Sequence, residues 1–463
     1  MTLCETNQER SALFVATLTS FMGPLMISAV NVALPAIQTD LNAGAVGLSW
    51  IATGYLLSIA VFLVPVGKLA DIHGRKKIFV TGLAINTLAA TIAACVPALG
   101  WLIAARVLQG LGAAMFVTTG MAILTSIFPP RRRGRVIGIY VAAVYVGLSV
   151  GPFVGGLLTQ HLGWRSVFGL MLPLGIVTIL VTLRYLKGEW ADAVDERFDT
   201  AGSLLYMGAV SMLVFGATRL PDPKGIGLLA GGFLGLLSFV WQELRVTHPV
   251  FDVTLFRRNH TFTFSSLAAL INYAATFALT FLLSLYLQYI KGLPPQTTGT
   301  VLMAQPTVMA LFSPLAGRLA DRIEPRLPAT AGMAMTALGL AFFIFLKDRT
   351  PLVLIIANLV WIGAGFAFFS SPNMSAIMGS VGKKHYGIAS GTVATMRLLG
   401  QLISMALATV VLALYIGPHP IGPDNFQLLL RSMQTCFTIS AFLCVIGAFF
   451  SIFRGDLNTG GEE

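Results

Sequence analysis

Fourteen apolar runs, most of them 20 residues or longer, leave this chain few folds to choose from. A helix needs roughly 20 apolar residues to cross the hydrocarbon core of a bilayer. The runs are about twice the length of a membrane barrel strand and lack its alternation of apolar and polar residues, so they predict helices. We expect spans at 11–37, 47–67, 76–97, 99–128, 135–159, 164–186, 199–219, 225–243, 261–289, 296–320, 327–346, 351–378, 386–416 and 429–453.

The composition also indicates a membrane protein. Hydrophobic residues make up 56% of the chain and charged residues 11%, and the mean hydropathy is +0.81. A soluble domain carries about twice that share of charge. The net charge of +11 does not indicate nucleic-acid binding, because the basic residues form short clusters between apolar runs. We find no metal-ligand cluster, nucleotide-binding loop or nucleophile with a base, and expect no metal, no cofactor and no catalysis.

The basic residues predict how the chain is oriented. An even number of spans puts both ends on one side, and the loops of that side hold most of the 30 Lys and Arg residues. The opposite loops hold Arg165, Arg219, Lys224, Lys291, Lys347, Arg349 and Arg431. Because basic loops stay in the cytoplasm, we expect both termini to be cytoplasmic, in a multi-pass protein of the inner (cytoplasmic) membrane.

Two polar connections divide the spans into six, two and six. We expect an N-terminal six-helix bundle at 1–186, a linker with two extra membrane helices at 187–260, a C-terminal six-helix bundle at 261–453 and a cytoplasmic tail at 454–463. The pattern Gly67-Lys68-Leu69-Ala70-Asp71 recurs as Gly317-Arg318-Leu319-Ala320-Asp321, at the same end of the second helix of each bundle. Parallel repeats of this kind place a ligand site between the halves, near the membrane midplane.

Two charges fall deep inside predicted spans, and both are arginines, Arg106 and Arg397. An intramembrane guanidinium must face a polar partner, a cavity or a ligand. None of the 19 acidic residues lies deep in a span. The central region is therefore expected to be basic.

The motifs resemble the major facilitator superfamily, in particular its fourteen-helix drug:proton antiporters. The segment 67–77 is similar to the signature between helices two and three, Arg106 to Gly110 to the helix-four motif, and 147–156 to the helix-five antiporter motif. Further similar stretches are Asn31 to Pro35, Trp50 with Tyr55, Phe198-Asp199 and Arg397 to Gly400. The resemblance implies an all-α transporter with a gate on the cytoplasmic face.

The gate is expected to consist of Gly67, Asp71, Gly74, Arg75, Gly317 and Asp321. A carboxylate at a helix end with an arginine one turn later, near the arginines at 131–135, can form a charge-assisted network that holds one conformation closed. The second copy has Glu324 where Gly74 would fall, so its gate is expected to differ. Helix five is expected to pack closely or to hinge at Gly147, Gly151, Pro152, Gly155 and Gly156.

One position departs from the resembled group. That group commonly has an acidic residue in helix one shortly before the Asn-Val-Ala-Leu-Pro stretch, and here the residue is Met26. We predict a substrate or coupling cavity lined by Met26, Asn31, Arg106, Gln109, Asn272, Gln305, Asn358, Trp361, Arg397 and Gln401. Tyr273 and Gln288 are further polar candidates. For each amide, a hydrogen bond between helices is the plain alternative.

Three functions remain open. The chain is expected to export small amphipathic compounds by alternating access as a monomer in the lipid bilayer, with protons exchanged through an interfacial group such as Asp71, Asp40 or His161. Alternatively, it exports or facilitates an anionic or neutral metabolite without an intramembrane carboxylate. A non-transporting receptor or scaffold is the third possibility, and the retained gate residues argue against it.

Overall fold

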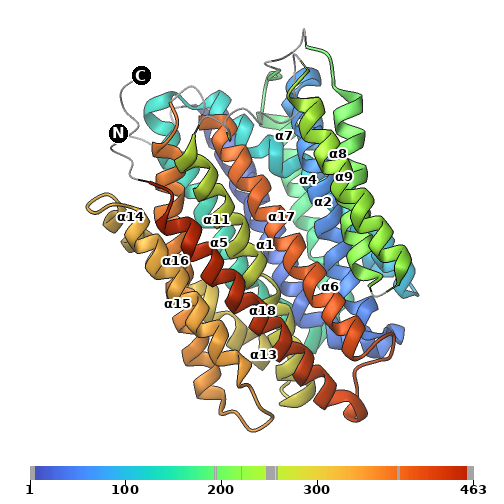
Figure 1. Ribbon diagram of the computed structural model, residues 1–463. Helices are drawn as coiled ribbons and strands as arrows, with labels where there is room; N and C mark the ends of the chain where they lie inside the picture. Colours follow the sequence, from blue (N-terminus) through green and yellow to red (C-terminus); the bar gives the residue numbers. More distant parts are fainter. Residues whose placement is uncertain are drawn as a thin grey trace.

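The computed structural model describes residues 6–191, 193, 196–220, 222–246, 256, 259–382 and 386–455. All regular structure in these residues is helical, and 14 spans are long and apolar enough to cross a membrane, so the predicted number is confirmed. The spans lie side by side, and α1 (Asn7–Leu41) begins at the end of the bundle where α18 (Phe426–Ile452) finishes (Figure 1). We call this end the terminal face and the opposite end the distal face.

The first six spans, here called the N-half, are α1 and five further spans. Their bounds are α2 (Ala45–His73), α3 (Arg75–Cys95), α4 (Leu99–Ile127), α5 (Pro130–Leu162), and α6 (Arg165–Gly169) followed by α7 (Met171–Tyr185). The sixth span is broken after Gly169, four residues before Pro173. Proline lacks the amide hydrogen that would bond to Gly169 O, which explains the break.

Two extra helices, α8 (Thr200–Thr218) and α9 (Pro223–Glu243), pack against each other at one edge of the bundle (Figure 1). Helix α8 also packs against α2 and α17 (Tyr386–Tyr415). Tyr206 donates a hydrogen bond to Ala60 O at 2.9 Å, and Phe215 stacks on Trp50 with centroids 5.0 Å apart. The extra pair is therefore attached along α2.

The last six spans form what we call the C-half. Their bounds are α11 (His260–Thr276), α12 (Ala278–Leu285) and the π-helix η1 (Tyr286–Ile290), then α13 (Pro295–Leu302) and α14 (Ala304–Ala320), α15 (Arg326–Ile344), α16 (Leu352–Gly379), α17, and the 3-10 turn η3 (Pro423–Asn425) with α18. Helix α13 ends four residues before Pro306, as α6 ends before Pro173. The tail predicted at 454–463 lies mostly outside the described residues, and the division at residues 186 and 260 stays a prediction.

The two halves repeat one packing scheme. A Cβ placed on Gly82 of α3 would lie 2.7 Å from Gly112 O of α4, so these helices cross at backbone contact. Helices α15 and α16 are the third and fourth spans of the C-half. A Cβ on Gly332 of α15 would lie 2.5 Å from Gly365 O of α16. The internal repeat seen in the sequence thus extends to equivalent helix crossings.

Apolar packing joins the halves unevenly. One continuous cluster of buried side chains includes Leu34 of α1, Leu283 of α12 and Leu412 of α17, all toward the distal face. Toward the terminal face, buried side chains of the C-half form two separate clusters, one around Met333 and one around Phe262. The halves therefore share a core at the distal face and keep separate cores near the terminal face.

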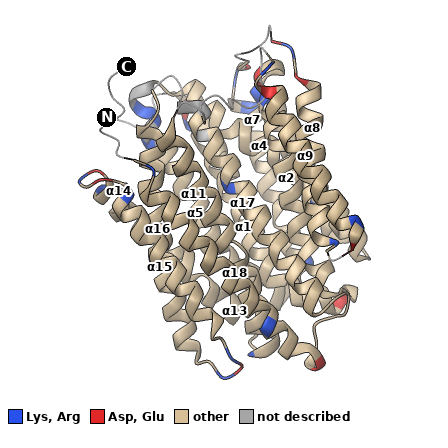
Figure 2. Ribbon diagram, viewed as in Figure 1, with Lys and Arg blue, Asp and Glu red and all other residues tan. Residues whose placement is uncertain are grey.

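Charge is distributed as a membrane requires. Lys, Arg, Asp and Glu gather at the two ends of the bundle, and its middle is almost free of them (Figure 2). This leaves an apolar belt between two charged faces.

Candidate functional site

The first gate pattern forms a charged network at the terminal face. Arg75 Nη2 lies 2.7 Å from Asp71 Oδ1, and Arg75 Nε donates to the same oxygen at 2.8 Å. Arg75 Nη1 donates to Ser126 Oγ of α4 at 2.7 Å. The pair thus links α2, α3 and α4, and its role in gating stays a prediction.

Gly74, between α2 and α3, has two structural reasons to be glycine. Its φ of 109° is one that L side chains rarely adopt, and a Cβ there would lie 2.6 Å from Glu189 Cδ. Glu189 Oε1 accepts from Lys76 N at 2.6 Å, and its Oε2 accepts from Lys77 N at 3.2 Å. A carboxylate here satisfies free amides at the start of α3 and complements the helix dipole.

The segment after α7 is held along the α2–α3 loop by backbone contacts as well. Arg75 N donates to Trp190 O at 2.8 Å, and Ala193 N donates to Asp71 O at 3.0 Å. Lys68 forms an ion pair with Glu196. The contacts of Glu189 and Glu196 with the α2–α3 region were not predicted from the sequence. The one signal for them was that both lie in a mixed-charge segment and that the α2–α3 loop is basic.

Two of the arginines after α4 contact groups that were not predicted. Arg132 Nη2 lies 2.6 Å from Glu9 Oε1 of α1, and Arg133 Nε donates to Phe128 O at 2.9 Å. Arg132 therefore fastens α5 to α1.

The second gate pattern does not repeat the ion pair. Asp321 is exposed, and Pro325 occupies the position of Arg75. Glu324 pairs with Arg326 at 2.9 Å instead. A Cβ on Gly317 would meet nothing within 4 Å, so no close approach requires this glycine. The predicted difference between the two copies is present in the structure.

A buried arginine, Arg454, lies at the terminal face of the C-half. Its Nη1 donates to Asn373 Oδ1 of α16 at 3.0 Å, and Thr261 Oγ1 of α11 donates to its carbonyl at 3.0 Å. Burial lowers the pKa of Arg454 to about 10, and the nearby Glu324 opposes that shift. The side chain is therefore still charged at neutral pH, and it ties together the ends of three C-half helices.

Arg106 is fully engaged inside the N-half. Only 1% of its surface is exposed; Nε donates to Ile51 O at 3.1 Å and Nη1 to Gln109 Oε1 at 2.6 Å. Its Cζ lies 4.1 Å from the centroid of the Tyr55 ring. These contacts explain how a charge is accommodated in this span without a carboxylate.

Arg397 has different surroundings, between the two halves. It is partly exposed on α17, beside the hydroxyl of Tyr273 of α11 and near that of Tyr140 of α5. One turn along α5, the Tyr145 hydroxyl lies 3.1 Å from Ser370 Oγ of α16, which joins the halves. We call Tyr140, Tyr145, Tyr273, Ser370 and Arg397 the Arg397 cluster. Sequence reasoning named Arg397 and Tyr273 but missed the other three.

Four other predicted cavity residues are buried: Met26, Asn31, Asn272 and Gln305. Asn31 O accepts from Ser284 Oγ of α12 at 2.7 Å, so this part of α1 contacts the C-half. Neither amide atom of Asn272 has a hydrogen-bond partner. Their part in a cavity stays a prediction.

The remaining predicted residues lie elsewhere. Asn358 donates to Gly339 O at 2.9 Å, and Trp361 donates to Met335 O at 2.8 Å. Both bonds join α16 to α15, and Trp361 is 45% exposed. Gln401 is partly exposed on α17, about one turn after Arg397. The structure does not bring Asn358 or Trp361 to the Arg397 cluster.

The small residues of α5 allow close packing on two sides. Cβ atoms on Gly147 and Gly155 would lie 2.5 Å from α1 backbone, and one on Gly151 would lie 1.9 Å from Ser28 Oγ. A Cβ on Gly156 would lie 2.4 Å from Pro295 O of α13, and one on Gly299 would lie 2.0 Å from Pro152 O. The first three positions bring α5 against α1, and the last two bring it against the C-half.

Hydrogen bonds between described residues of the two halves gather toward the distal face. Gln38 Nε2 donates to Ile421 O at 2.8 Å, and Ala45 N donates to His419 O at 3.0 Å. His161 Nε2 lies 3.2 Å from Gln296 Oε1, and Gln288 Nε2 donates to Val32 O at 3.0 Å. A further contact between the halves, Ser149 Oγ to Thr307 Oγ1 at 3.0 Å, lies near the middle of both spans. The distal face is therefore closed by polar as well as apolar contacts.

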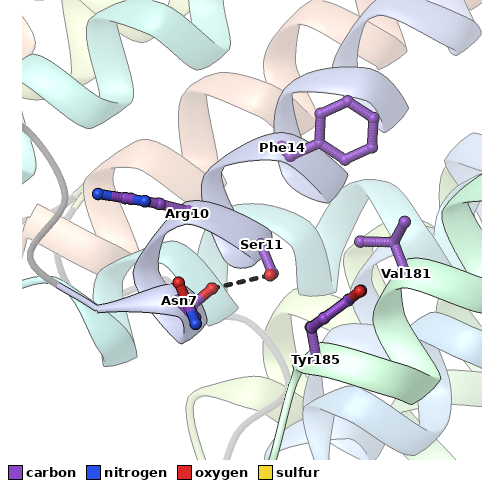
Figure 3. A pocket seen from close by; sticks show the side chains of 6 residues that line it. All are labelled: Asn7, Arg10, Ser11, Phe14, Val181 and Tyr185. Carbon is purple, nitrogen blue, oxygen red and sulfur yellow. Dashed lines mark hydrogen bonds between the residues drawn. The ribbon is translucent and has the colours of Figure 1, made fainter.

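A shallow pocket of about 330 Å³ opens at the terminal face between α1 and α7 (Figure 3). Its lining residues are Asn7, Arg10, Ser11, Phe14, Val181 and Tyr185. Within it, Ser11 Oγ donates to Asn7 O at 2.8 Å. None of the predicted site residues lines it, so it is separate from the Arg397 cluster.

The part of the chain that the structure describes holds no group of three or more His, Cys, Asp or Glu side chains that could bind a metal. Its polar groups between the halves include an arginine, hydroxyls, amides and the His161 imidazole. Groups of these kinds can bind and orient a solute.

Comparison with known proteins bears on the whole chain. Residues 16–405 match the Major Facilitator Superfamily, with a second match over 265–460. Multidrug resistance protein Stp of Mycobacterium tuberculosis is 34% identical over 425 residues, covering 89% of this chain and 78% of that protein. Riboflavin transporter RibZ of Clostridioides difficile is 29% identical over 450 residues, covering 96% and 98%. The tetracenomycin C resistance and export protein of Streptomyces glaucescens is 30% identical over 405 residues, covering 86% and 74%.

Solved structures agree on the fold. The peptide transporter POT in complex with alafosfalin has a TM-score of 0.69 and covers 96% of this chain and 94% of its own. Its sequence identity is 14%, so the likeness shows the fold alone. The family match, the fourteen spans and the repeated packing of two six-span halves together show that this chain is a multi-pass membrane transporter of the Major Facilitator Superfamily.

Proposed function

We propose that this protein is a secondary transporter that exports small amphipathic, drug-like compounds by alternating access. The main support is that the two halves contact each other unequally at the two faces. They share a core and hydrogen bonds at the distal face and have separate cores near the terminal face. In alternating access, two bundles rock around a central site so that one face closes while the other opens. With both termini in the cytoplasm, this arrangement corresponds to the state that takes up a solute from inside.

The names of the relatives support the kind of solute. One is named for multidrug resistance, one for resistance to and export of tetracenomycin C, and one for riboflavin transport. All three names point to organic compounds of modest size. Because every element of the proposed route comes from a single chain, a monomer suffices for transport.

Among the three interfacial groups, we propose His161 as the one that couples proton movement to transport. Asp71 is held by Arg75, and Asp40 by Arg165 at 2.6 Å, so both are engaged within the N-half. His161 instead lies against Gln296 of the C-half, in a contact that belongs to the closed distal face. Binding a proton at a contact between the halves would bias the two conformations.

Cross-linking the two halves tests alternating access. Ser149 and Thr307 meet across the halves at 3.0 Å, near the middle of both spans, so a disulfide between cysteines at these positions should fix the halves in this arrangement. In a cysteine-free background, oxidised Ser149→Cys/Thr307→Cys protein should lose export from proteoliposomes and recover it on reduction. The matched control is Thr330→Cys/Ser451→Cys, a 3.0 Å pair within the C-half, which should transport in both states. Undiminished export by the cross-linked Ser149→Cys/Thr307→Cys protein would refute the proposal.

Internal pH separates the coupled and uncoupled versions. Proteoliposomes with a pH-sensitive dye inside should show proton movement when a transported compound is added, and His161→Gln should reduce the protons moved per solute. Solute flux without any proton movement would favour the facilitator of a neutral or anionic metabolite. Binding of solutes without flux would favour the receptor.

A further inference from the structure

The two intramembrane arginines are not equivalent, and their difference suggests a binding site. Arg106 is enclosed by Ile51 O, Gln109 Oε1 and the Tyr55 ring. The hydroxyls of Tyr273 and Tyr140 lie near Arg397, and no ion pair between described residues includes it. A guanidinium inside a membrane protein with neither a counter-ion nor full enclosure is energetically unfavourable unless a ligand or water reaches it.

The Arg397 cluster is built from both halves. Tyr140 and Tyr145 come from α5, Tyr273 from α11, Ser370 from α16 and Arg397 from α17. The hydroxyls of Tyr145 and Ser370 lie 3.1 Å apart across the interface, so these side chains face the opposite half rather than lipid. Tyr145, Tyr273, Ser370 and Arg397 nevertheless remain partly exposed. Partial exposure of side chains that face the other half indicates accessible space between the halves.

The chemistry of the cluster selects one class of solute. A guanidinium forms charge-assisted hydrogen bonds with a carboxylate or an acidic phenol, and tyrosine hydroxyls can donate to the same group. The aromatic rings favour a flat aromatic partner, and the Tyr273 ring already packs edge-on against Phe366 with centroids 5.3 Å apart. A cation would be repelled by Arg397, because the described spans place no carboxylate beside it.

Resting on the transport function proposed above, we infer that the Arg397 cluster binds planar aromatic solutes through an anionic carboxylate or acidic phenol group. Arg397 pairs with the anion, Tyr140 and Tyr273 hold it by their hydroxyls, and the rings of Tyr145 and Tyr273 contact the flat body. Because the cluster spans both halves, rocking them apart alters the site and releases the solute on the other side.

Three probes with one ring system test the charge preference. Anthracene-9-carboxylate, anthracene-9-carboxamide and 9-anthracenylmethylammonium share a flat body and differ in the charge of one group. Equilibrium dialysis against protein in zwitterionic nanodiscs, corrected with empty nanodiscs, gives the affinity for each. We expect the carboxylate to bind about tenfold to a hundredfold more tightly than the other two, as a charge-assisted bond predicts.

Variants assign that preference to the cluster. Arg397→Gln should reduce carboxylate affinity to that of the carboxamide while leaving carboxamide binding unchanged, and Arg397→Lys should restore part of the difference. Tyr273→Phe should lower carboxylate affinity a few-fold. Arg431→Gln, which removes an exposed arginine at the distal start of α18, is the matched control and should change nothing.

Other outcomes overturn the inference. Wild-type protein that binds the ammonium best, or all three probes equally, rules out an anion site. An Arg397→Gln variant that keeps the carboxylate preference places the anion elsewhere. Binding and transport are measured separately, so the two proposals can fail independently. Solute flux without a preference for the anion would refute only this inference. Anion-selective binding without flux would refute only the transport proposal.

Discussion

The two gate patterns end the second span of their halves in different ways. In the N-half, Asp71 pairs with Arg75, and Glu189 from the segment after α7 caps α3. In the C-half, Asp321 is exposed, and Pro325 stands where Arg75 would be. The C-half uses the buried Arg454 at its terminal face instead. In the N-half, partly exposed ion pairs link the second span to other segments; the C-half has the Glu324–Arg326 pair between near neighbours in the chain and the buried bond from Arg454 to Asn373.

This difference indicates unequal mechanical roles. Ion pairs near water can break and form again at small net cost, because water replaces the lost partner. A buried arginine cannot lose its bond to Asn373 so cheaply, because its donor would stay unsatisfied. The N-half gate is therefore better suited to change during transport, while the C-half end is better suited to remain rigid.

The spans differ in the same sense. Gly112 of α4 and Gly365 of α16 occupy equivalent positions in the two helix crossings. If the two helices are aligned on these glycines, Leu359 of α16 stands at the position of Arg106 in α4. The C-half has its own intramembrane arginine, Arg397, in a different span and facing the other half. Arg106 thus contacts helices of its own half, whereas Arg397 lies beside Tyr273 of its own half and near Tyr140 of the other.

The largest expected effect is at Arg106. Arg106→Leu copies the C-half residue, leaves Gln109 Oε1 without its donor and removes the second donor of Ile51 O, a carbonyl within helix α2. Each unsatisfied buried group costs about 1 to 3 kcal/mol. We expect export to fall to background and the thermal midpoint in detergent to drop clearly. Normal export with an unchanged midpoint would show that the halves do not differ at this position.

The two gate aspartates give the next largest contrast. Asp71→Asn removes a charge-assisted pair and should lower export about tenfold. Asp321→Asn changes an exposed side chain and should lower export by less than about twofold. Initial rates from proteoliposomes with equal protein content measure both. Equal losses would mean that the two patterns act alike despite their different partners.

The glycines of the two patterns should respond with opposite signs. Gly74→Ala forces a side chain into a φ of 109° and against Glu189, which should destabilise the protein by about 1 to 3 kcal/mol. Gly317→Ala meets nothing within 4 Å inside a helix, where alanine is favoured over glycine by up to about 1 kcal/mol. Thermal midpoints should fall for the first and hold or rise for the second; a rise for Gly74→Ala would contradict the strain argument.

The smallest effect is a response to salt. Raising ionic strength from about 0.1 M to about 1 M shortens the screening length from about 10 Å to about 3 Å. The midpoint difference between wild type and Asp71→Asn should therefore shrink at high salt. Asn373→Ala, which removes the partner of the buried Arg454, should show the same difference in both solutions. A salt response at Asn373 and none at Asp71 would reverse the assignment of exposed and buried ends.

Local patterns predicted the gate only in part. Asp71 and Arg75 stand four residues apart where α2 meets α3, so their pairing follows from sequence spacing. Glu189 reaches Lys76 N across 113 positions, and no spacing rule predicts that contact. The Arg132 pair with Glu9, 123 positions apart, escaped prediction for the same reason. Asn358 and Trp361 were polar residues in a span, and only the packing of α15 on α16 shows which way they point.

The sequence by itself determined the number of spans, their helical character and the repeated half, because span length, hydrophobicity and proline positions act locally along the chain. Only the tertiary structure decided which arginine is enclosed and which faces the other half, and which face of the molecule is closed. Those outcomes depend on hydrogen bonds and close approaches between segments far apart in sequence, such as Gln38 with Ile421, and no local pattern encodes them.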